Sequence, residues 1–148
     1  MARTDRGLAL IKEYDQRNAF ASSLGLSLQV IGEGLVTYSL TVEDAHLATP
    51  GFAHGGVLTT LLDATMGAGA LTLVADEGLV VSTIEMQVNF IQAATLNERI
   101  IASSMVVRKG KKVIFMRAEI RNEHNKLIAV SNGSFYPFKA EKAGYTLN

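Results

Sequence analysis

The chain has 148 residues, and its 14 lysines and arginines balance its 14 aspartates and glutamates. This length is typical of one domain, so we expect residues 1–148 to form a single domain. Zero net charge argues against a general nucleic-acid-binding protein and against electrostatic capture by an anionic membrane. Cysteine is absent, which excludes disulfides, thiolate nucleophiles and cysteine-ligated metal sites.

The hydrophobic fraction is 48% and only 19% of the residues are charged. This composition is too apolar for a disordered chain and is high for a small soluble monomer. It therefore indicates either a membrane span or an oligomer that buries apolar surface. Residues 1–6 lead into a charged segment rather than an apolar one, so no secretory signal is expected and a cytoplasmic location is predicted.

Residues 4–20 have apolar side chains at helical spacing and predict a short amphipathic helix. Alternating apolar residues over 26–30 and 36–42 predict two strands, and the Gly32-Glu33-Gly34 turn between them predicts a hairpin. Residues 43–53 contain Pro50 and Gly51 and are expected to form a loop.

Residues 57–74 contain one charged side chain, Asp63, among apolar and small residues on all sides. This pattern predicts a long helix that is buried all round. A membrane span is the alternative, but the segment is at the short limit and contains Asp63, threonines and glycines.

Four further strands are predicted, and they are expected over residues 83–90, 100–108, 112–122 and 126–137. Their short connections imply antiparallel pairing. A basic turn, Lys109-Gly110-Lys111, joins the second and third of them. Residues 138–148 are expected to form a loosely held tail. The whole order predicts an α+β fold in which a curved antiparallel sheet of five to six strands wraps round one apolar helix.

Several catalytic motifs are absent from the sequence. There is no Gly-x-Ser-x-Gly elbow, no phosphate-binding Gly-x-x-x-x-Gly-Lys loop and no His-Glu-x-x-His metal motif. The three histidines, His46, His54 and His124, are scattered, so no metal site is expected.

Asp63 is the most informative residue. An ionised carboxylate in an apolar helix costs several kcal/mol unless it is paired or hydrogen-bonded. It is therefore either a functional group or a structural aspartate that accepts hydrogen bonds from nearby hydroxyls. The sequence leaves both interpretations open.

The same helix begins with His54-Gly55-Gly56. Glycines at a helix N-terminus leave backbone N–H groups open to a ligand, which is an oxyanion-hole arrangement for acyl transfer. A tight turn is the alternative interpretation. Asp63 lies eight residues after Gly55, about 12 Å along a helix axis, which is too far for both to act on one carbonyl carbon. In a two-fold dimer, Asp63 of each subunit could lie at the helix N-terminus of its partner. Such a dimer would bring the two groups together at two equivalent sites.

The run His46-Leu47-Ala48-Thr49-Pro50-Gly51-Phe52-Ala53-His54-Gly55-Gly56 with downstream Asp63 resembles the hotdog-fold thioesterases of the PaaI-like branch. Further similarity lies in residues 82–90 and in the Arg108-Lys109-Gly110-Lys111-Lys112 turn, and it extends over about residues 20–138. The resemblance implies a hotdog fold and hydrolysis of acyl-CoA thioesters. It implies no metal or redox cofactor, since CoA is part of the substrate.

The resemblance also implies roles for individual residues. The Gly55 amide would polarise the thioester carbonyl, His54 would hold the loop or the substrate, and Gly56 would contact the substrate. Asp63 of the facing subunit would act as general base or nucleophile, and Thr83 would orient the water. Residues 108–112 would meet CoA phosphates, although a solvated turn is equally expected. Family members often have asparagine where this chain has Ala48.

These features predict an acyl-CoA thioesterase for aryl or medium-chain acyl groups that works as a homo-oligomer, a dimer or a dimer of dimers (homotetramer). The first alternative is a non-catalytic hotdog protein that binds acyl-CoA or a protein partner, which Ala48 favours. The second is a hydratase or dehydratase, although Asp63 on the helix fits hydrolysis better.

Overall fold

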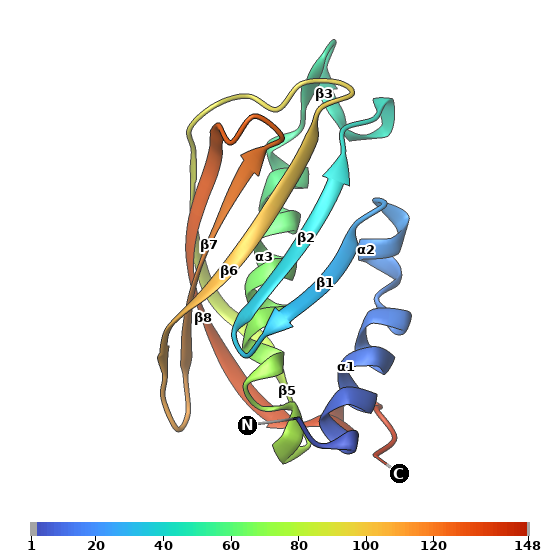
Figure 1. Ribbon diagram of the computed structural model, residues 1–148, viewed down its shortest axis with the longest axis vertical. Helices are drawn as coiled ribbons and strands as arrows, with labels where there is room; N and C mark the ends of the chain where they lie inside the picture. The colour runs from blue at the N-terminus through green and yellow to red at the C-terminus, as the bar shows by residue number, and fades with distance from the viewer. Residues whose placement is uncertain (1–2, 148) are drawn as a thin grey trace.

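A six-stranded antiparallel sheet curves round one long helix in the computed structural model, which describes residues 3–147 (Figure 1). The helix is α3 (Gly55–Thr72). The strands are β1 (Ser27–Gly32), β2 (Leu35–Thr41), β5 (Leu79–Phe90), β6 (Arg99–Lys109), β7 (Ile114–Asn122) and β8 (Leu127–Lys139). They lie in the order β1-β2-β6-β7-β8-β5. The expected α+β architecture is therefore confirmed, and the predicted hairpin is β1–β2.

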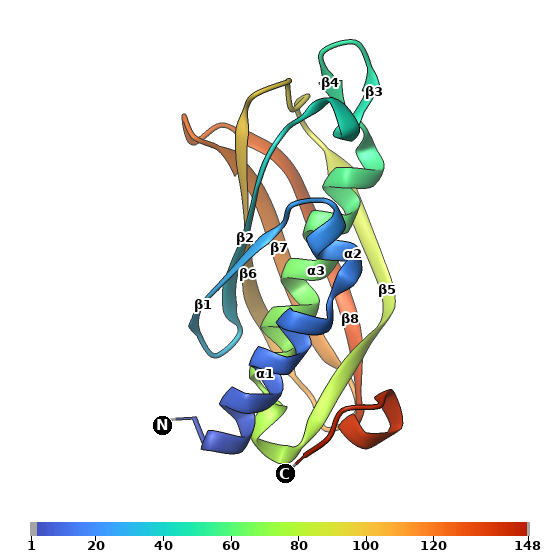
Figure 2. The ribbon, with the colours of Figure 1, turned by 90° about the vertical axis from the view of Figure 1, so that its right-hand side faces the viewer.

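The predicted N-terminal helix is two helices, α1 (Asp5–Arg17) and α2 (Ala19–Ser23). The break is at Asn18, whose side-chain oxygen accepts a hydrogen bond from the Ala21 N–H and so caps α2. Helix α1 runs beside α3 and buries Leu10 and Ile11 (Figures 1 and 2). Phe20, which the pattern places on the apolar face, is 64% exposed because the break changes the direction of its side chain.

The predicted loop over 43–53 contains short regular elements. A 3₁₀ turn, η1 (Asp44–His46), leads into a small hairpin of β3 (Leu47–Thr49) and β4 (Phe52–Ala53). Gly51 has a φ of 85°, a left-handed conformation that glycine adopts without strain. The hairpin ends directly at the start of α3 and so positions its first turn.

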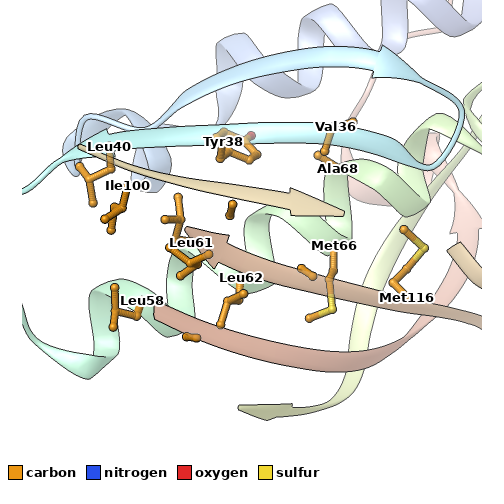
Figure 3. Packing of buried hydrophobic residues seen from close by; sticks show 14 of the residues in the cluster. Val36, Tyr38, Leu40, Leu58, Leu61, Leu62, Met66, Ala68, Ile100 and Met116 are labelled. Carbon is orange, nitrogen blue, oxygen red and sulfur yellow. The ribbon is translucent and has the colours of Figure 1, made fainter. Parts of the chain in front are cut away.

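The expectation that α3 is buried on every side is wrong for one stripe. Most of the helix packs into the concave face of the sheet, where Leu61, Leu62 and Met66 are fully buried (Figure 3). Thr60, Asp63, Ala64 and Gly67 instead remain partly exposed, at spacings that place them on one face. No helix within residues 3–147 is both long and apolar enough to cross a bilayer.

Strand β5 does not pair with the strand that follows it. It pairs with β8, whereas β6 pairs with β2 and β7. The connection from β5 to β6 therefore crosses the end of the sheet that lies near β4, where Thr95 pairs with Phe52. All of the pairings are antiparallel, as expected, but the implied neighbour pairing of β5 with β6 is wrong. This order leaves β5 as an edge strand of twelve residues.

The C-terminal segment is packed rather than loosely held. Strand β8 continues through Pro137 to Lys139, and a 3₁₀ turn, η3 (Ala140–Ala143), follows it. Ala140 is fully buried, and Arg17 of α1 donates a hydrogen bond to the Gly144 carbonyl while it lies over the Tyr145 ring. The predicted tail over 138–148 is therefore wrong up to residue 147, and residue 148 lies outside the described residues.

Two glycines of α3 give a matched test of this packing. A Cβ at Gly69 would lie 2.9 Å from the Met116 side chain and would also meet the Ser104 hydroxyl, whereas at Gly67 it would meet only the Phe135 ring, at 3.6 Å. We expect Gly69→Ala to lower the free energy of unfolding by about 1–3 kcal/mol through overpacking. Gly67→Ala should raise it by about 0.5–1 kcal/mol because alanine favours a helix. Chemical denaturation of both variants measures the two changes, and equal effects would contradict the packing described here.

Candidate active site

Asp63 lies midway along the open stripe of α3 and faces strand β5. Its carboxylate accepts a hydrogen bond from the Thr83 hydroxyl, with 2.7 Å between the two oxygens. Both residues line a cavity of about 330 Å³ between α1–α2 on one side and β5 and β8 on the other. Figure 2 shows α1 and α2 in front of α3 and β5 along its right-hand side. The structure thus brings together Asp63 and Thr83, which the family resemblance implies for the site, and the other carboxylate oxygen of Asp63 makes no hydrogen bond within residues 3–147.

A β-bulge brings Thr83 to the helix. The register of β5 against β8 shifts between Thr83 and Glu85, so Ile84 is an extra residue and is 56% exposed. A bulge reverses the phase of side-chain alternation along a strand. Thr83 therefore shares the concave face with Met86 and Val88, which pack against the core. Strict alternation would place Thr83 on the opposite face from them.

In the first turn of α3, one of the two glycine N–H groups is hydrogen-bonded within residues 3–147 and the other is not. Nδ1 of His54, the N-cap residue, accepts a hydrogen bond from the Gly56 N–H at 2.7 Å. No acceptor for the Gly55 N–H is found within residues 3–147. The expectation that His54 holds the loop fits this geometry, and Gly55 rather than Gly56 has a backbone N–H without a hydrogen bond in this part of the chain.

Gly55 faces a second cavity, also of about 330 Å³, which Phe90 helps to line. A Cβ at Gly55 would lie 3.3 Å from the tip of the Phe90 ring, so the ring covers this position. Gly55 does not line the cavity of Asp63, and Asp63 does not line that of Gly55. One protomer therefore holds the two expected groups apart, at about 12 Å along the axis of α3.

His46 supports the loop before the helix. It is 4% exposed, its Nδ1 accepts from the Glu43 N–H, and its Nε2 donates to the Leu24 carbonyl. Its own carbonyl accepts from the His54 N–H at 2.7 Å. Sequence reasoning missed this role because every partner is a backbone group that no motif identifies. No group of three or more histidine, aspartate or glutamate side chains suited to a metal ion occurs in residues 3–147.

The basic turn lies at the other end of α3. Lys109 donates to the Leu73 carbonyl at 2.8 Å and pairs with Glu77 at 3.0 Å, so it is held by the C-terminal end of the helix. Gly110 closes the turn with a hydrogen bond to the Val113 carbonyl. Leu73 is about 27 Å from Gly55 but about 15 Å from Asp63 along the helix. Arg108, Lys111 and Lys112 are exposed and have no ion pair within the described part of the chain.

Two tyrosines were not predicted as part of a site, and one of them, Tyr14, lies near Asp63. Tyr14 lines the Asp63 cavity, and its hydroxyl accepts a hydrogen bond from the Asn18 amide at 3.4 Å. Burial, with smaller contributions from Tyr145 and Asp63, raises the pKa of Tyr14 to about 12. The fully buried Tyr38 has no hydrogen-bond partner for its hydroxyl in residues 3–147. The sequence signal is weak because tyrosine on the apolar face of a helix is also an ordinary core residue.

The comparisons with known proteins identify the family. Residues 50–129 match the family model described as the thioesterase superfamily. This chain belongs to the thioesterase superfamily. The expectation of a thioester hydrolase is confirmed at this level. The chain is 30% identical to human acyl-coenzyme A thioesterase 13 over 122 residues, which are 81% of this chain and 86% of that protein.

Two solved structures are similar to this chain in fold. The Escherichia coli PaaI protein superposes with a TM-score of 0.84 at 20% identity, covering 93% of this chain and 96% of that one. A Streptococcus pneumoniae protein described as a hypothetical thioesterase, solved with coenzyme A, has a TM-score of 0.76 at 22% identity, covering 87% and 97%. The predicted hotdog fold is thereby confirmed.

Proposed function

We propose that this thioesterase hydrolyses aryl- or medium-chain acyl-CoA to the free acid and CoA, at a site shared between two subunits. The observation that carries the proposal is the separation of Asp63 and Gly55 into different cavities of one protomer. Within residues 3–147, Asp63 has one carboxylate oxygen, and Gly55 one backbone N–H, that makes no hydrogen bond. The carboxylate can act as base or nucleophile, and the N–H can bind the carbonyl oxygen of the same thioester. A two-fold axis that brings Asp63 to Gly55 of the partner subunit makes two identical sites.

The reaction follows from these two groups. The thioester oxygen accepts a hydrogen bond from the Gly55 N–H at the helix N-terminus, where developing negative charge is favourable. Asp63 either takes a proton from a water that attacks the carbonyl carbon or attacks that carbon itself. The carbon–sulfur bond then breaks and CoA leaves as the thiolate. After direct attack by Asp63, water hydrolyses the resulting acyl–aspartyl anhydride, which releases the free acid and restores the carboxylate. Thr83 fixes the carboxylate through its hydrogen bond.

The edge of the sheet supports a homo-oligomer. Strand β5 presents twelve residues at an open edge, and exposed strand edges of this length are normally covered in proteins. Ile84 on this strand and Phe90 at its end are more than half exposed. A second copy of the chain paired along β5 covers this surface and lies next to both Asp63 and Gly55. Association into a dimer, or a dimer of dimers, is therefore part of the proposal.

The Asp63 cavity suits the acyl group. Its walls include Leu71, Val81, Phe135 and Phe138, which offer an apolar surface large enough for a ring or a medium-length chain. CoA enters as part of the substrate, and no metal or redox cofactor takes part. A cytoplasmic location remains a prediction.

A panel of acyl-CoA thioesters, assayed by release of the free thiol, tests this function. We expect turnover of aryl and medium-chain substrates and slower turnover of acetyl-CoA. Ala48, which is exposed in β3, favours one second candidate, a protein that binds acyl-CoA without cleaving it. Binding of the panel by calorimetry without thiol release would establish that candidate and contradict the first. A monomer at micromolar concentration would contradict the shared site.

The basic turn gives a separate prediction about CoA binding. Since Lys109 is held within its own subunit, the exposed Arg108, Lys111 and Lys112 are left to meet the CoA phosphates, and the two lysines lie in the turn itself. Replacing both by alanine should raise KM about three- to tenfold and leave kcat unchanged. The KM of the wild type should rise with salt more steeply than that of the variant. Lys126→Ala, at another exposed turn, is the control. If it changes KM as much as the double substitution does, Lys111 and Lys112 are solvated residues that do not bind the CoA phosphates.

A further inference from the structure

We propose that His46 is a positioning residue for the Gly55 N–H, and that it performs this role only while its imidazole ring is neutral. The inference rests on the proposed function, in which the Gly55 N–H binds the thioester oxygen. It goes further because His46 lines neither the Asp63 cavity nor the Gly55 cavity, and yet it makes kcat depend on a second protonation besides that of Asp63.

Two backbone groups fix the protonation state of the His46 ring. The Glu43 N–H can only donate, so Nδ1 of the ring, 2.9 Å away, carries no proton. The Leu24 carbonyl can only accept, so Nε2 of the ring, 2.8 Å away, carries one. His46 is buried, and both ring nitrogens are used within the protein. The position therefore holds a neutral imidazole in a single tautomer.

The same residue connects the end of α2 to the helix N-terminus that carries Gly55. Leu24 is the C-cap residue of α2, so the bond from Nε2 fixes the η1 turn against that segment. The His46 carbonyl accepts a hydrogen bond from the His54 N–H at 2.7 Å, across the β3–β4 hairpin. The planar peptide group that joins His54 to Gly55 carries the Gly55 N–H. The direction of this N–H therefore depends on how firmly His46 is held.

A second proton on the ring breaks one of these bonds. The proton goes to Nδ1 and faces the Glu43 N–H, so two donors meet and the hydrogen bond between the two nitrogens is lost. A buried cation without an acceptor for its proton is unfavourable, which drives the charged ring from its position. The η1 turn then loosens, and with it the His46 carbonyl that holds the His54 N–H. Acid thus displaces the Gly55 donor through a residue that takes no part in the chemistry.

No charged group around the ring offsets the second proton. The segments that contain its partners in α2 and the β3–β4 hairpin, residues 18–32 and 47–53, have no charged side chain. On the η1 turn, Glu43 and Asp44 are exposed, and no ion pair of His46 is found within residues 3–147.

Two further titratable groups lie on neighbouring segments, and both have other partners. Glu98, in the loop that hydrogen-bonds to the Val42 backbone, accepts a hydrogen bond from the Asn122 amide at 2.6 Å. Nδ1 of His54 accepts from the Gly56 N–H. Because His54 can also take up a proton, a test of His46 must leave His54 in place.

His46→Asn separates the hydrogen bond from the titration. Its side-chain oxygen lies near the position of Nδ1, accepts from the Glu43 N–H and takes up no proton. We expect its kcat to stay within about threefold of the wild-type value above neutral pH. In acid, log kcat should fall with pH less steeply than in the wild type, by up to about one unit of slope, because one protonation no longer acts. His124→Asn makes the same change on an exposed turn and should keep the wild-type slope.

His46→Gln makes the complementary change. Its amide reaches the position of Nε2 and still donates to the Leu24 carbonyl, but the Glu43 N–H loses its acceptor. We expect kcat to fall about ten- to hundredfold, as for a small misplacement of a group in the reaction, and KM to change less than about threefold. A side chain with only a structural role would instead lower the unfolding temperature of both variants and leave kcat and its acid slope unchanged.

Nuclear magnetic resonance of the ¹⁵N-labelled protein tests the same arrangement without substrate. At neutral pH, the His46 ring should give the signals of a neutral imidazole with its proton on Nε2. Hydrogen exchange of the His54 amide should be about tenfold faster in His46→Gln than in the wild type, because its acceptor is less firmly held. A proton on Nδ1 at neutral pH, or equal exchange in the two proteins, would overturn the inference.

The outcomes separate this inference from the proposed function. If the wild type hydrolyses no acyl-CoA thioester, the proposed function fails, and the exchange of the His54 amide still decides whether His46 holds this turn. If the wild type is active but His46→Asn keeps the wild-type acid slope, the function stands and the inference is overturned. Wild-type kcat in His46→Gln has the same consequence. Circular dichroism at each pH verifies that the fold is intact.

Discussion

Asp63→Asn is expected to lower kcat for the best acyl-CoA substrate by about 10²–10⁴-fold, which is the range for loss of a positioned acid–base group. The amide is isosteric and keeps an oxygen that accepts the Thr83 hydrogen bond, so the local structure is preserved. It removes the negative charge that activates water or attacks the carbonyl carbon. KM should change little because this charge acts mainly in the transition state.

A matched substitution separates this effect from a general loss of charge. Asp44→Asn makes the same chemical change on the exposed η1 turn, and it should leave kcat and KM at their wild-type values. Steady-state kinetics of both variants, with circular dichroism to verify the fold, measure the difference. Full activity of Asp63→Asn would show that the carboxylate has only a structural role. That is the interpretation that the sequence alone leaves open.

The sequence predicts well what depends on local pattern and composition. One charge within an apolar helix identifies Asp63, and the two glycines after His54 identify the helix N-terminus. The alternation in β5 predicts a strand, but it assigns Thr83 to the wrong face. The bulge at Ile84 reverses the alternation of side chains along the strand, and the residue type at that position does not predict a bulge. Thr83 was therefore found through family resemblance and not through periodicity.

Contacts between distant segments account for what the sequence could not predict. The pairing of β5 with β8 instead of β6 depends on the loop that crosses the open end of the sheet. Tyr14 enters the site because α1 runs beside the open stripe of α3, and local spacing shows only that Tyr14 lies on the apolar face. The position of Lys109 depends likewise on a carbonyl 36 residues earlier in the chain.

Gly55→Pro is expected to lower kcat by about 10²–10³-fold, as does the loss of one oxyanion-hole donor in other acyl-transfer enzymes. Gly55 is the first residue of α3, a position where proline is favoured because its N–H makes no intrahelical bond. His54 has a ψ of 136°, an extended conformation that is compatible with a following proline. The substitution therefore deletes one N–H and leaves the helix in place.

Gly55→Ala is the matched control for Gly55→Pro. It adds the same Cβ, 3.3 Å from the Phe90 ring, but retains the N–H. We expect its kcat to fall far less than that of the proline variant. Equal losses in both variants would mean that the contact with Phe90, and not the missing N–H, causes the defect.

Mixing the two inactive variants tests the shared site directly. If Asp63 acts with Gly55 of the partner subunit, a heterodimer of Asp63→Asn and Gly55→Pro has one site that carries both substitutions and one that carries neither. Random exchange makes half of the dimers mixed, so activity should recover to about one quarter of the wild-type value. If both groups act within one subunit, every site keeps one substitution and no activity returns. Recovery should follow the rate of subunit exchange after the variants are mixed, whereas each variant alone stays inactive at every concentration.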